Sequence, residues 1–260
     1  HEAKIIAKRL KELNPSIPII AGGYLGSTAE TLFQTAPIDA IVRGEGELTT
    51  PELSEALLNG SDITKVKGIL LFKENKVIST GERGQISNLD DIPIPDYSLV
   101  DLKRYISNLD NFCDFSSDSR SNNYKGGQME IRTSRGCTNG CTFCYRHMRG
   151  IRHHSPKYVL NHIKFLQDNY KIDFFSLSDE LTISDDIWPL EFCRLKIEMK
   201  MDFLFRICAV RVDKVNPSML KALYEAGCVE MDFGIESGSQ RMLDAMKKMV
   251  TVKLNLTKSA

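Results

Sequence analysis

Three cysteines stand close together near the middle of this sequence. Cys137, Cys141 and Cys144 lie in the segment "TSRGCTNGCTFCYRHMRG", which runs from Thr133 to Gly150. Thiols at this spacing could form a disulfide, bind zinc or hold an iron-sulfur cluster. Three thiolates are one ligand short of a closed tetrahedral zinc site or a cubane cluster, so the fourth ligand decides between these chemistries.

One alternative is a zinc site closed by His147, which stands three residues after Cys144. With such a site the chain would be a non-catalytic zinc-binding module. A module that holds an iron-sulfur cluster without catalysing a reaction is the related alternative. Structural zinc sites usually stabilise small domains that lack a core, whereas this chain is long enough to bury one. An open coordination position would instead let a substrate or cofactor complete the ligands of the metal.

The composition argues against the disulfide. The chain has 260 residues, including 7 cysteines, and its formal net charge is zero. An odd number of cysteines at irregular spacings, without a charged and then apolar leader, does not suit a disulfide framework, because the cytosol keeps thiols reduced. No apolar run approaches the ~20 residues of a membrane span. We therefore expect a cytoplasmic protein that binds neither nucleic acid nor a membrane.

Strand and helix patterns alternate through the second half of the sequence. Four apolar strand segments read "QMEIRTS", "IDFFSLS", "DFLFRICAV" and "VEMDFGI", and each is followed by a helical segment. Asn216 followed by Pro217 is typical of a helix N-terminus. Four consecutive strand-helix units predict a barrel or part of one, with the chemistry at the C-terminal ends of the strands.

The first half also alternates strands with helices. We expect strands in "SIPIIAGG" and "IDAIVRGEGE", helices in "STAETLFQTA" and "TPELSEALLNG", and two strands around a turn in "VKGILLFKENKVIST". Pro51 is placed in the first turn of the second helix. This order is typical of a doubly wound parallel sheet.

A stretch of different composition separates the two halves. "NLDDIPIPDYSLVDLKRYI" is acidic and contains two prolines, and "SSDSRSNNYKGG" is small and polar. Such segments are typical of connections between domains. The expected parts are a first domain at residues 1–82, a connector at 83–127 and a second domain at 128–260.

The cysteine segment carries a resemblance to a known family. Cys137, Cys141, Phe143 and Cys144 match every specified position of C-x3-C-x-aromatic-C, the signature of the radical S-adenosylmethionine enzymes. The resemblance implies a partial (β/α)6 barrel in which the three thiolates bind three irons of a 4Fe-4S cluster. It implies that S-adenosylmethionine chelates the fourth iron and is cleaved to methionine and a 5'-deoxyadenosyl radical. This radical would abstract hydrogen from a small-molecule substrate. An electron donor such as flavodoxin or ferredoxin is the implied partner.

The same resemblance assigns cofactor contacts at the strand ends. Phe143 would border the adenine, and Asp179 and Glu180 in "SLSDELT" match the segment that binds the S-adenosylmethionine amino group. Arg211 in "CAVRVD" could pair with the cofactor carboxylate. The residues alone leave other roles open: a rim aromatic at position 143, helix-cap carboxylates at 179 and 180, and a surface salt bridge at 211.

A further cofactor contact is implied after the fourth strand. "GIESGSQRML" resembles a segment of the subgroup whose barrels follow a cobalamin domain. There Glu236 and Ser237 would border the ribose and the amino acid moiety of S-adenosylmethionine. A tight strand-to-helix turn with a serine cap is the alternative.

The first half resembles the second half of a cobalamin-binding domain. "AGGYLGSTAETLF" and "IDAIVRGEGELTTPEL" carry this likeness, and Gly22 and Gly23 match a glycine pair that lets the nucleotide tail of cobalamin approach the backbone. Turn glycines after a parallel strand are the alternative. "CTFCYRHMRGIRHHSPKYVLNHI" looks closest to the branch that contains the anaerobic magnesium-protoporphyrin IX monomethyl ester cyclase.

Parts of the family pattern do not occur in this sequence. It opens at His1, the family's cobalt-facing loop would lie upstream of the glycine pair, and four of six expected barrel strands are present. We therefore expect an α/β fragment of a longer enzyme, with the C-terminal half of a doubly wound cobalamin-binding-like domain followed by an incomplete (β/α)6 barrel. The expected reaction is cobalamin-dependent methyl transfer or cyclisation, with a tRNA methylthiotransferase as the alternative within the superfamily.

Overall fold

The computed structural model describes residues 2–23, 29–109, 120, 127–145, 148 and 150–252 of the chain. The chain divides into two compact units, His1–Ser87 and Asn88–Ala260. Within the described ranges, no helix is long and apolar enough to cross a membrane.

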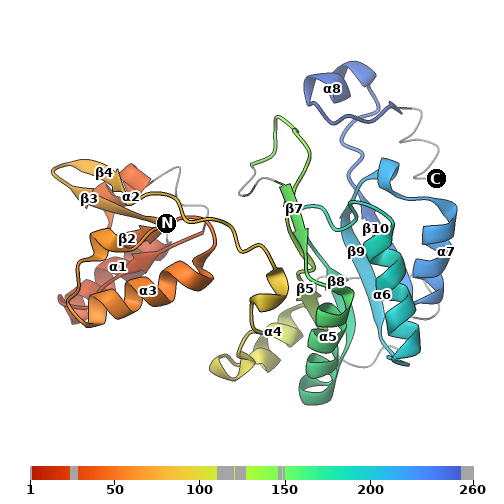
Figure 1. The fold of residues 1–260 in the computed structure, drawn as a ribbon, viewed down its shortest axis with the longest axis horizontal. Coiled ribbons are helices and arrows are strands. Elements are labelled where there is room, and N and C mark those ends of the chain that lie inside the picture. Colours follow the sequence, from red (N-terminus) through yellow and green to blue (C-terminus); the bar gives the residue numbers. More distant parts are fainter. Residues whose placement is uncertain are drawn as a thin grey trace. The chain divides into compact units, whose positions relative to one another are not determined.

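The first unit is built on a four-stranded sheet of order β1-β2-β3-β4 (Figure 1). β1 and β2 run parallel, whereas β3 is antiparallel to both β2 and β4. The predicted order of strands and helices is confirmed, but the parallel part of the sheet is limited to its first pair because β3 and β4 form a hairpin. The elements are α1 (Glu2–Leu13), β1 (Ile20–Ala21), α2 (Ala29–Thr35), β2 (Ala40–Val42), α3 (Gly46–Leu58), η2 (Ile63–Lys65), β3 (Ile69–Lys73) and β4 (Lys76–Ser79).

Alternation along the strands lets this sheet bury both of its faces. Ile41 and Leu70 pack into one apolar cluster with Leu32 of α2. Val42 belongs to a second cluster that includes Leu53 of α3. Helices therefore cover the two faces, as expected for a layered α/β domain.

The start of α3 corrects one prediction. α3 begins at Gly46 rather than at Thr50, so Pro51 lies inside the helix and not in its first turn. A proline at this position leaves the carbonyl of Glu47 without its helical donor, which a helix tolerates most easily close to its start.

The second unit contains a four-stranded parallel sheet of order β10-β9-β8-β5. These are the four strands predicted for the second half. The elements are η3 (Leu89–Asp91), η4 (Tyr97–Leu99), α4 (Leu102–Leu109), β5 (Gly127–Ile131), β6 (Ser134–Cys137), β7 (Gly150–His153), α5 (Pro156–Tyr170), β8 (Ile172–Leu177), α6 (Ile187–Glu198), β9 (Leu204–Val210), η6 (Val212–Lys214), α7 (Pro217–Glu225), β10 (Cys228–Phe233) and α8 (Gln240–Ala245).

One face of the parallel sheet packs on helices and the other carries polar side chains. Phe175 and Phe205 lie in the core cluster together with Ile163 of α5. On the opposite face, the Arg206 Nε donates to Ser176 Oγ of the neighbouring strand at 2.5 Å. The helices therefore cover the apolar face of the sheet, and the polar residues of β8 and β9 point away from them.

The predicted helix boundaries in this unit have clear caps. The side chain of Asn216 accepts a hydrogen bond from the Met219 amide at 2.9 Å, as predicted for the start of α7. After α7, Gly227 adopts φ +98°, and a Cβ at this position would lie 3.1 Å from the Phe203 carbonyl oxygen. The turn into β10 therefore requires glycine.

A short antiparallel pair, β6 and β7, was not predicted. The segment "QMEIRTS" was expected to form one strand, but β5 ends at Ile131 and β6 starts at Ser134. β6 and β7 pair from Ser134 opposite His153 to Cys137 opposite Gly150. The first cysteine is thus the last residue of a strand.

Candidate functional site

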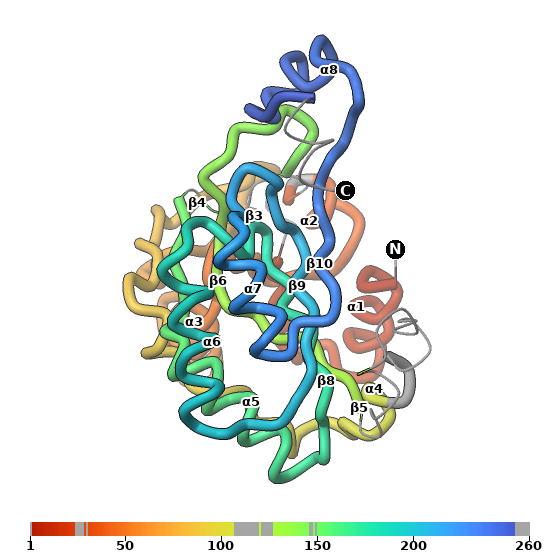
Figure 2. Tube along the Cα trace, turned by 90° about the vertical axis from the view of Figure 1, so that its right-hand side faces the viewer, coloured from red at the N-terminus to blue at the C-terminus, as the bar shows by residue number. Residues whose placement is uncertain are grey.

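The residues expected to do chemistry follow the C-terminal ends of the four parallel strands. The cysteine segment follows β5, Asp179 and Glu180 follow β8, Arg211 follows β9, and Glu236 follows β10. Because the strands are parallel, these ends lie at one edge of the sheet. α8 lies beyond the same edge in both views (Figure 1, Figure 2).

The β6–β7 hairpin positions Cys137 at this edge. Gly136 adopts φ +87°, and a Cβ there would lie 2.4 Å from the Gly150 carbonyl oxygen on the facing strand. Only glycine permits this approach, so the residue before Cys137 is fixed by backbone geometry.

The three thiols of the segment are chemically available. Cys137, Cys141 and Cys144 form no disulfide within the described ranges, and all three are at least partly exposed. The Asn139 backbone N and side-chain Nδ2 both donate to Cys137 Sγ at 3.4 Å. Hydrogen bonds to sulfur stabilise a thiolate and tune the potential of a bound cluster, so this donor set fits an iron-sulfur cluster.

The thiols are not gathered into a ligand cage in this conformation. No group of three or more His, Cys, Asp or Glu side chains is placed to hold a metal ion within the described ranges. His147, the fourth ligand of the zinc alternative, lies outside these ranges. The fit to a cluster therefore rests on the chemistry and number of the donors.

The cysteine loop, which connects β6 to β7 and carries Cys141 and Cys144, contacts the end of α8. The Thr142 backbone N donates to the Met246 carbonyl at 2.9 Å. Lys248 Nζ, two residues further on, pairs with Glu236 Oε1 at 2.8 Å. The turn after α8 thus joins the cysteine loop to the segment that follows β10.

Arg211 holds the same turn from the end of β9. It is 6% exposed, and it forms a bidentate pair with Asp213 at 2.8 and 3.0 Å. Its guanidinium also donates to the carbonyls of Lys248 at 2.8 Å and Met249 at 3.3 Å. These contacts show that the guanidinium has protein partners, and its predicted pairing with a cofactor carboxylate stays a prediction. Asp213 was missed, although its spacing of two residues from Arg211 was a usable signal.

Asp179 is likewise occupied by the chain itself. It is 7% exposed and accepts hydrogen bonds from the Thr133 and Ser134 amides and from the Thr133 hydroxyl. Burial raises the pKa of this carboxyl, although the hydrogen bonds from Thr133 and Ser134 oppose the shift. Glu180 is exposed at the same strand end. Of the two predicted amine ligands, Glu180 is the one whose carboxylate faces solvent.

The remaining predicted site residues are accessible. Phe143 is 56% exposed, and Glu236 adopts φ +61° in the turn after β10. The Ser237 hydroxyl accepts from the Ser239 amide at 3.1 Å. These positions are compatible with cofactor contacts and with the turn that was the alternative for "GIESGSQRML".

The glycine pair lies in the first unit, directly after β1. Gly23 adopts φ +78°, a conformation that other residues rarely take. A Cβ on Gly22 would make only ordinary contact with Val42, at 3.9 Å or more. Backbone geometry therefore favours glycine at position 23, whereas position 22 has room for a small side chain such as that of alanine.

Comparison with known proteins identifies the second unit. Residues 131–256 match the Radical SAM superfamily, in which SAM is S-adenosylmethionine. The chain contains a radical SAM domain. This confirms the family resemblance, and together with relatives named as a methyltransferase and a cyclase it supports an enzyme. The family implies a 4Fe-4S cluster and S-adenosylmethionine as cofactors.

Two curated relatives match the radical SAM chain over nearly its whole length. The uncharacterized methyltransferase PH0819 of Pyrococcus horikoshii is 32% identical over 96% of this chain and 52% of its own length. The anaerobic magnesium-protoporphyrin IX monomethyl ester cyclase of Synechocystis is 30% identical over 92% of this chain and 46% of its own length. The chain thus spans about half the length of these relatives.

A solved structure shares the fold. The cobalamin-dependent S-adenosylmethionine radical enzyme OxsB, solved with aqua-cobalamin and S-adenosylmethionine bound, superposes with a TM-score of 0.77 over 97% of this chain and 35% of its own length. The two sequences are 22% identical. The likeness confirms an α/β fold with a parallel sheet of the kind found in cobalamin-dependent radical SAM enzymes.

Proposed function

We propose that the chain is part of a cobalamin-dependent radical SAM enzyme that methylates or cyclises a small-molecule substrate. The observation that carries the proposal is a set of three accessible thiols, none in a disulfide within the described ranges, that follow the first strand of the parallel sheet in a radical SAM domain. Relatives named as a methyltransferase and a cyclase support the two reaction types.

In this proposal the β6–β7 hairpin, called the cysteine hairpin below, holds the metal cofactor. Cys137, Cys141 and Cys144 provide three thiolates, and the two N–H groups of Asn139 stabilise the charge on the first sulfur. When bound, a 4Fe-4S cluster supplies the electron that cleaves S-adenosylmethionine and generates the radical. The protein's own task is to orient this site and to exclude water from it.

The strand-end residues then divide into ligands and supports. Glu180 is assigned to the amino group of S-adenosylmethionine because its carboxylate is exposed at the edge of the sheet. Phe143 is assigned to the adenine, and Glu236 with Ser237 to the ribose and amino acid moiety. Arg211 supports the turn after α8, since its donors already bind Asp213 and two carbonyls.

The first unit is assigned to cobalamin. Gly22 and Gly23 follow a parallel strand, where a backbone without side chains admits a nucleotide tail. The likeness to OxsB supports this assignment at the level of the fold. A flavodoxin or ferredoxin as electron donor and a cytoplasmic location complete the proposal.

Anaerobic reconstitution with iron and sulfide tests the cluster. We expect about four iron and four sulfide ions per chain, and a loss of most of this iron when Cys137, Cys141 and Cys144 are all changed to Ser. Cys193→Ala is the matched control, because this thiol is buried in the core far along the chain from the hairpin. Iron binding that survives the triple change, or a colourless protein that retains one zinc, would contradict the proposal.

A further inference from the structure

The β6–β7 hairpin is too small to fix its own orientation. It pairs only four residues on each strand, from Ser134 opposite His153 to Cys137 opposite Gly150. A two-stranded hairpin is marginally stable in water unless it packs against other elements. The position of Cys137 therefore depends on what holds the hairpin at its base, where Ser134 and His153 face each other.

Asp179 holds the strand that enters the hairpin. One carboxylate oxygen accepts the Thr133 amide at 2.8 Å and the Ser134 amide at 3.0 Å, and the other accepts the Thr133 hydroxyl. Thr133 is fully buried. Two amides at the sharp turn between β5 and β6 would thus lack acceptors without this carboxylate.

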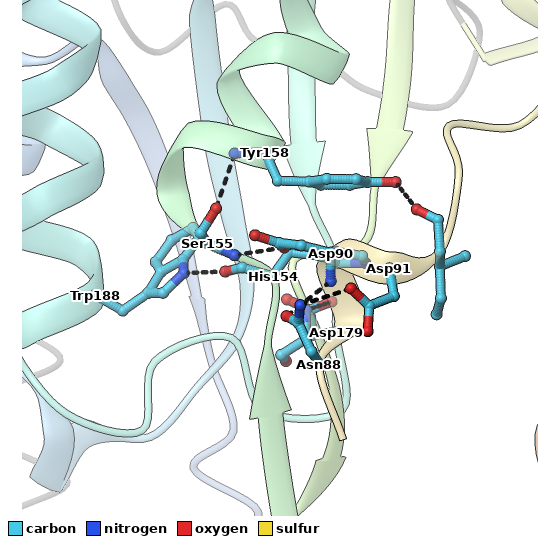
Figure 3. A network of polar contacts seen from close by, with 10 residues as sticks. Asn88, Asp90, Asp91, His154, Ser155, Tyr158, Asp179 and Trp188 are labelled. Atoms are coloured by element: carbon cyan, nitrogen blue, oxygen red, sulfur yellow. Dashed lines mark hydrogen bonds and ion pairs between the residues drawn. The ribbon is translucent and has the colours of Figure 1, made fainter. Parts of the chain in front are cut away.

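Asp90 holds the segment that leaves the hairpin. Its Oδ1 accepts the Ser155 amide at 2.9 Å and faces His154 Nδ1 at 3.3 Å. Although burial opposes ionisation, the hydrogen bonds from Ser155 and His154 keep the pKa of Asp90 below its usual value. Figure 3 shows Asp90 against His154 and Ser155, with Asp179 close by.

Further contacts fix this second corner. The His154 ring stacks on Tyr158 at 4.2 Å between centroids, and the Tyr158 hydroxyl donates to the Ile92 carbonyl at 2.8 Å. Trp188 Nε1 donates to the His154 carbonyl at 2.7 Å (Figure 3). The two corners are joined because the His154 amide donates to the Thr133 carbonyl at 2.8 Å.

We propose that Asp179 and Asp90 are positioning residues that clamp the two ends of the cysteine hairpin and so set the environment of the cluster. The inference rests on the proposed function for its cluster, but the clamp itself is a property of the chain. It gives Asp179 a role other than binding the cofactor amine, and it gives the connector residue Asp90 a role in the active site.

Hydrogen exchange of the full chain tests the clamp without any cofactor. We expect Asp179→Ala and Asp90→Ala to speed exchange of the β6 and β7 amides at least tenfold. The exchange rates of the α7 amides should stay unchanged. Thr133→Val, which removes only the hydroxyl donor, should give a smaller effect in the same direction and keeps the test valid if Asp179→Ala does not fold. Asp91→Ala and Asp186→Ala are controls.

The two control residues match in type and location. The Asp91 carboxylate accepts a hydrogen bond from the nearby Asn88 side chain at 2.8 Å and, among the described residues, has no hydrogen bond to the hairpin. Asp186 is exposed and makes no side-chain cap to α6. Hairpin exchange that is as slow in Asp179→Ala and Asp90→Ala as in these controls overturns the clamp.

The reconstituted chain tests whether the clamp sets the cluster environment. We expect shifted g values of the reduced cluster and at least threefold faster cluster loss in the two alanine variants. Asp179→Asn and Asp90→Asn should restore both readouts, because an amide oxygen can still accept the backbone N–H groups.

The outcomes separate the two proposals. Faster hairpin exchange with unchanged cluster spectra and lifetime would overturn the positioning role. If the unmodified chain binds no iron, the proposed function fails, and the exchange rates alone then support or overturn the clamp.

Discussion

At the scale of single residues, the β6–β7 hairpin depends on glycine at position 136 and on the carboxylates of Asp179 and Asp90. The spacing of Cys137, Cys141 and Cys144 was recognisable as the family signature, because that pattern is local in sequence, and their role as cluster ligands stays a prediction. The partners of Asp179 were not predictable in the same way. Its acceptor contacts with Thr133 span 46 positions, and nothing in "SLSDELT" distinguishes a carboxylate that faces a cofactor from one that faces a buried turn.

Gly136 provides a test at this scale. Gly136→Ala should displace β6 from β7, because its Cβ would lie 2.4 Å from the Gly150 carbonyl oxygen and its φ is +87°. We expect a severalfold loss of bound iron after reconstitution. Gly140→Ala is the control in the same segment, since a Cβ there meets no atom of the described residues within 4 Å. Equal iron content in the two variants would refute this reading of the hairpin.

His162 provides a pH-dependent prediction. Burial lowers the pKa of this imidazole from 6.5 to about 4, and Nε2 lies 2.8 Å from the Tyr97 hydroxyl. The unfolded chain binds a proton near pH 6.5 and the folded chain does not until about pH 4. The contribution of His162 to the free energy of unfolding is therefore complete above pH 6.5. It decreases by roughly 3 kcal/mol as the pH falls from 6.5 to about 4.

Urea unfolding at several pH values measures this effect. His162→Gln, which can still bond to Tyr97, should flatten part of the decline between pH 6.5 and 4. His153 and His154 also have pKa values lowered by burial, so some pH dependence persists in the variant. Identical slopes for the variant and the unmodified chain would show that His162 does not titrate as inferred.

At the scale of elements, the helices and strands that were predicted are those that a short stretch of sequence specifies. The four parallel strands and the start of α7 at Asn216 were predicted because apolar runs and caps specify them within a few residues. β6 and β7 were missed because their pairing lacks an alternating pattern and depends on contacts from η3 and β8. The early start of α3 was missed because proline was taken to mark a first turn.

The turn after α8 gives a prediction at this scale. Arg211→Lys should destabilise the second unit by about 1–3 kcal/mol, because lysine cannot replace a bidentate pair and two carbonyl contacts at once. Asp213→Asn should act in the same direction if Arg211 is a support. Urea unfolding measures both.

Surface charge provides the control for this comparison. Arg194 pairs with Glu191 at 2.6 Å and with Glu198 on the exposed face of α6. Arg194→Lys should leave the free energy of unfolding nearly unchanged, because exposed ion pairs contribute little to stability. If Asp213→Asn leaves stability unchanged while Arg211→Lys abolishes S-adenosylmethionine binding, Arg211 is a cofactor ligand after all.

At the scale of the whole molecule, the chain joins a mixed α/β unit to a radical SAM domain. The cysteine signature predicted the superfamily through its resemblance to a known family, and the comparisons confirm it. The substrate was not predictable, since no residue of the described site carries a pattern that distinguishes methyl transfer from ring closure. The chain also spans only about half of its curated relatives.

The proposed function requires that this chain holds a cluster able to cleave S-adenosylmethionine. The most direct measurement is the formation of 5'-deoxyadenosine and methionine by the anaerobically reconstituted chain with dithionite or reduced flavodoxin. We expect both products in the unmodified chain and none above background in Cys141→Ser. A cluster-loaded chain that leaves S-adenosylmethionine intact, or equal product in the Cys141→Ser variant, would contradict the account.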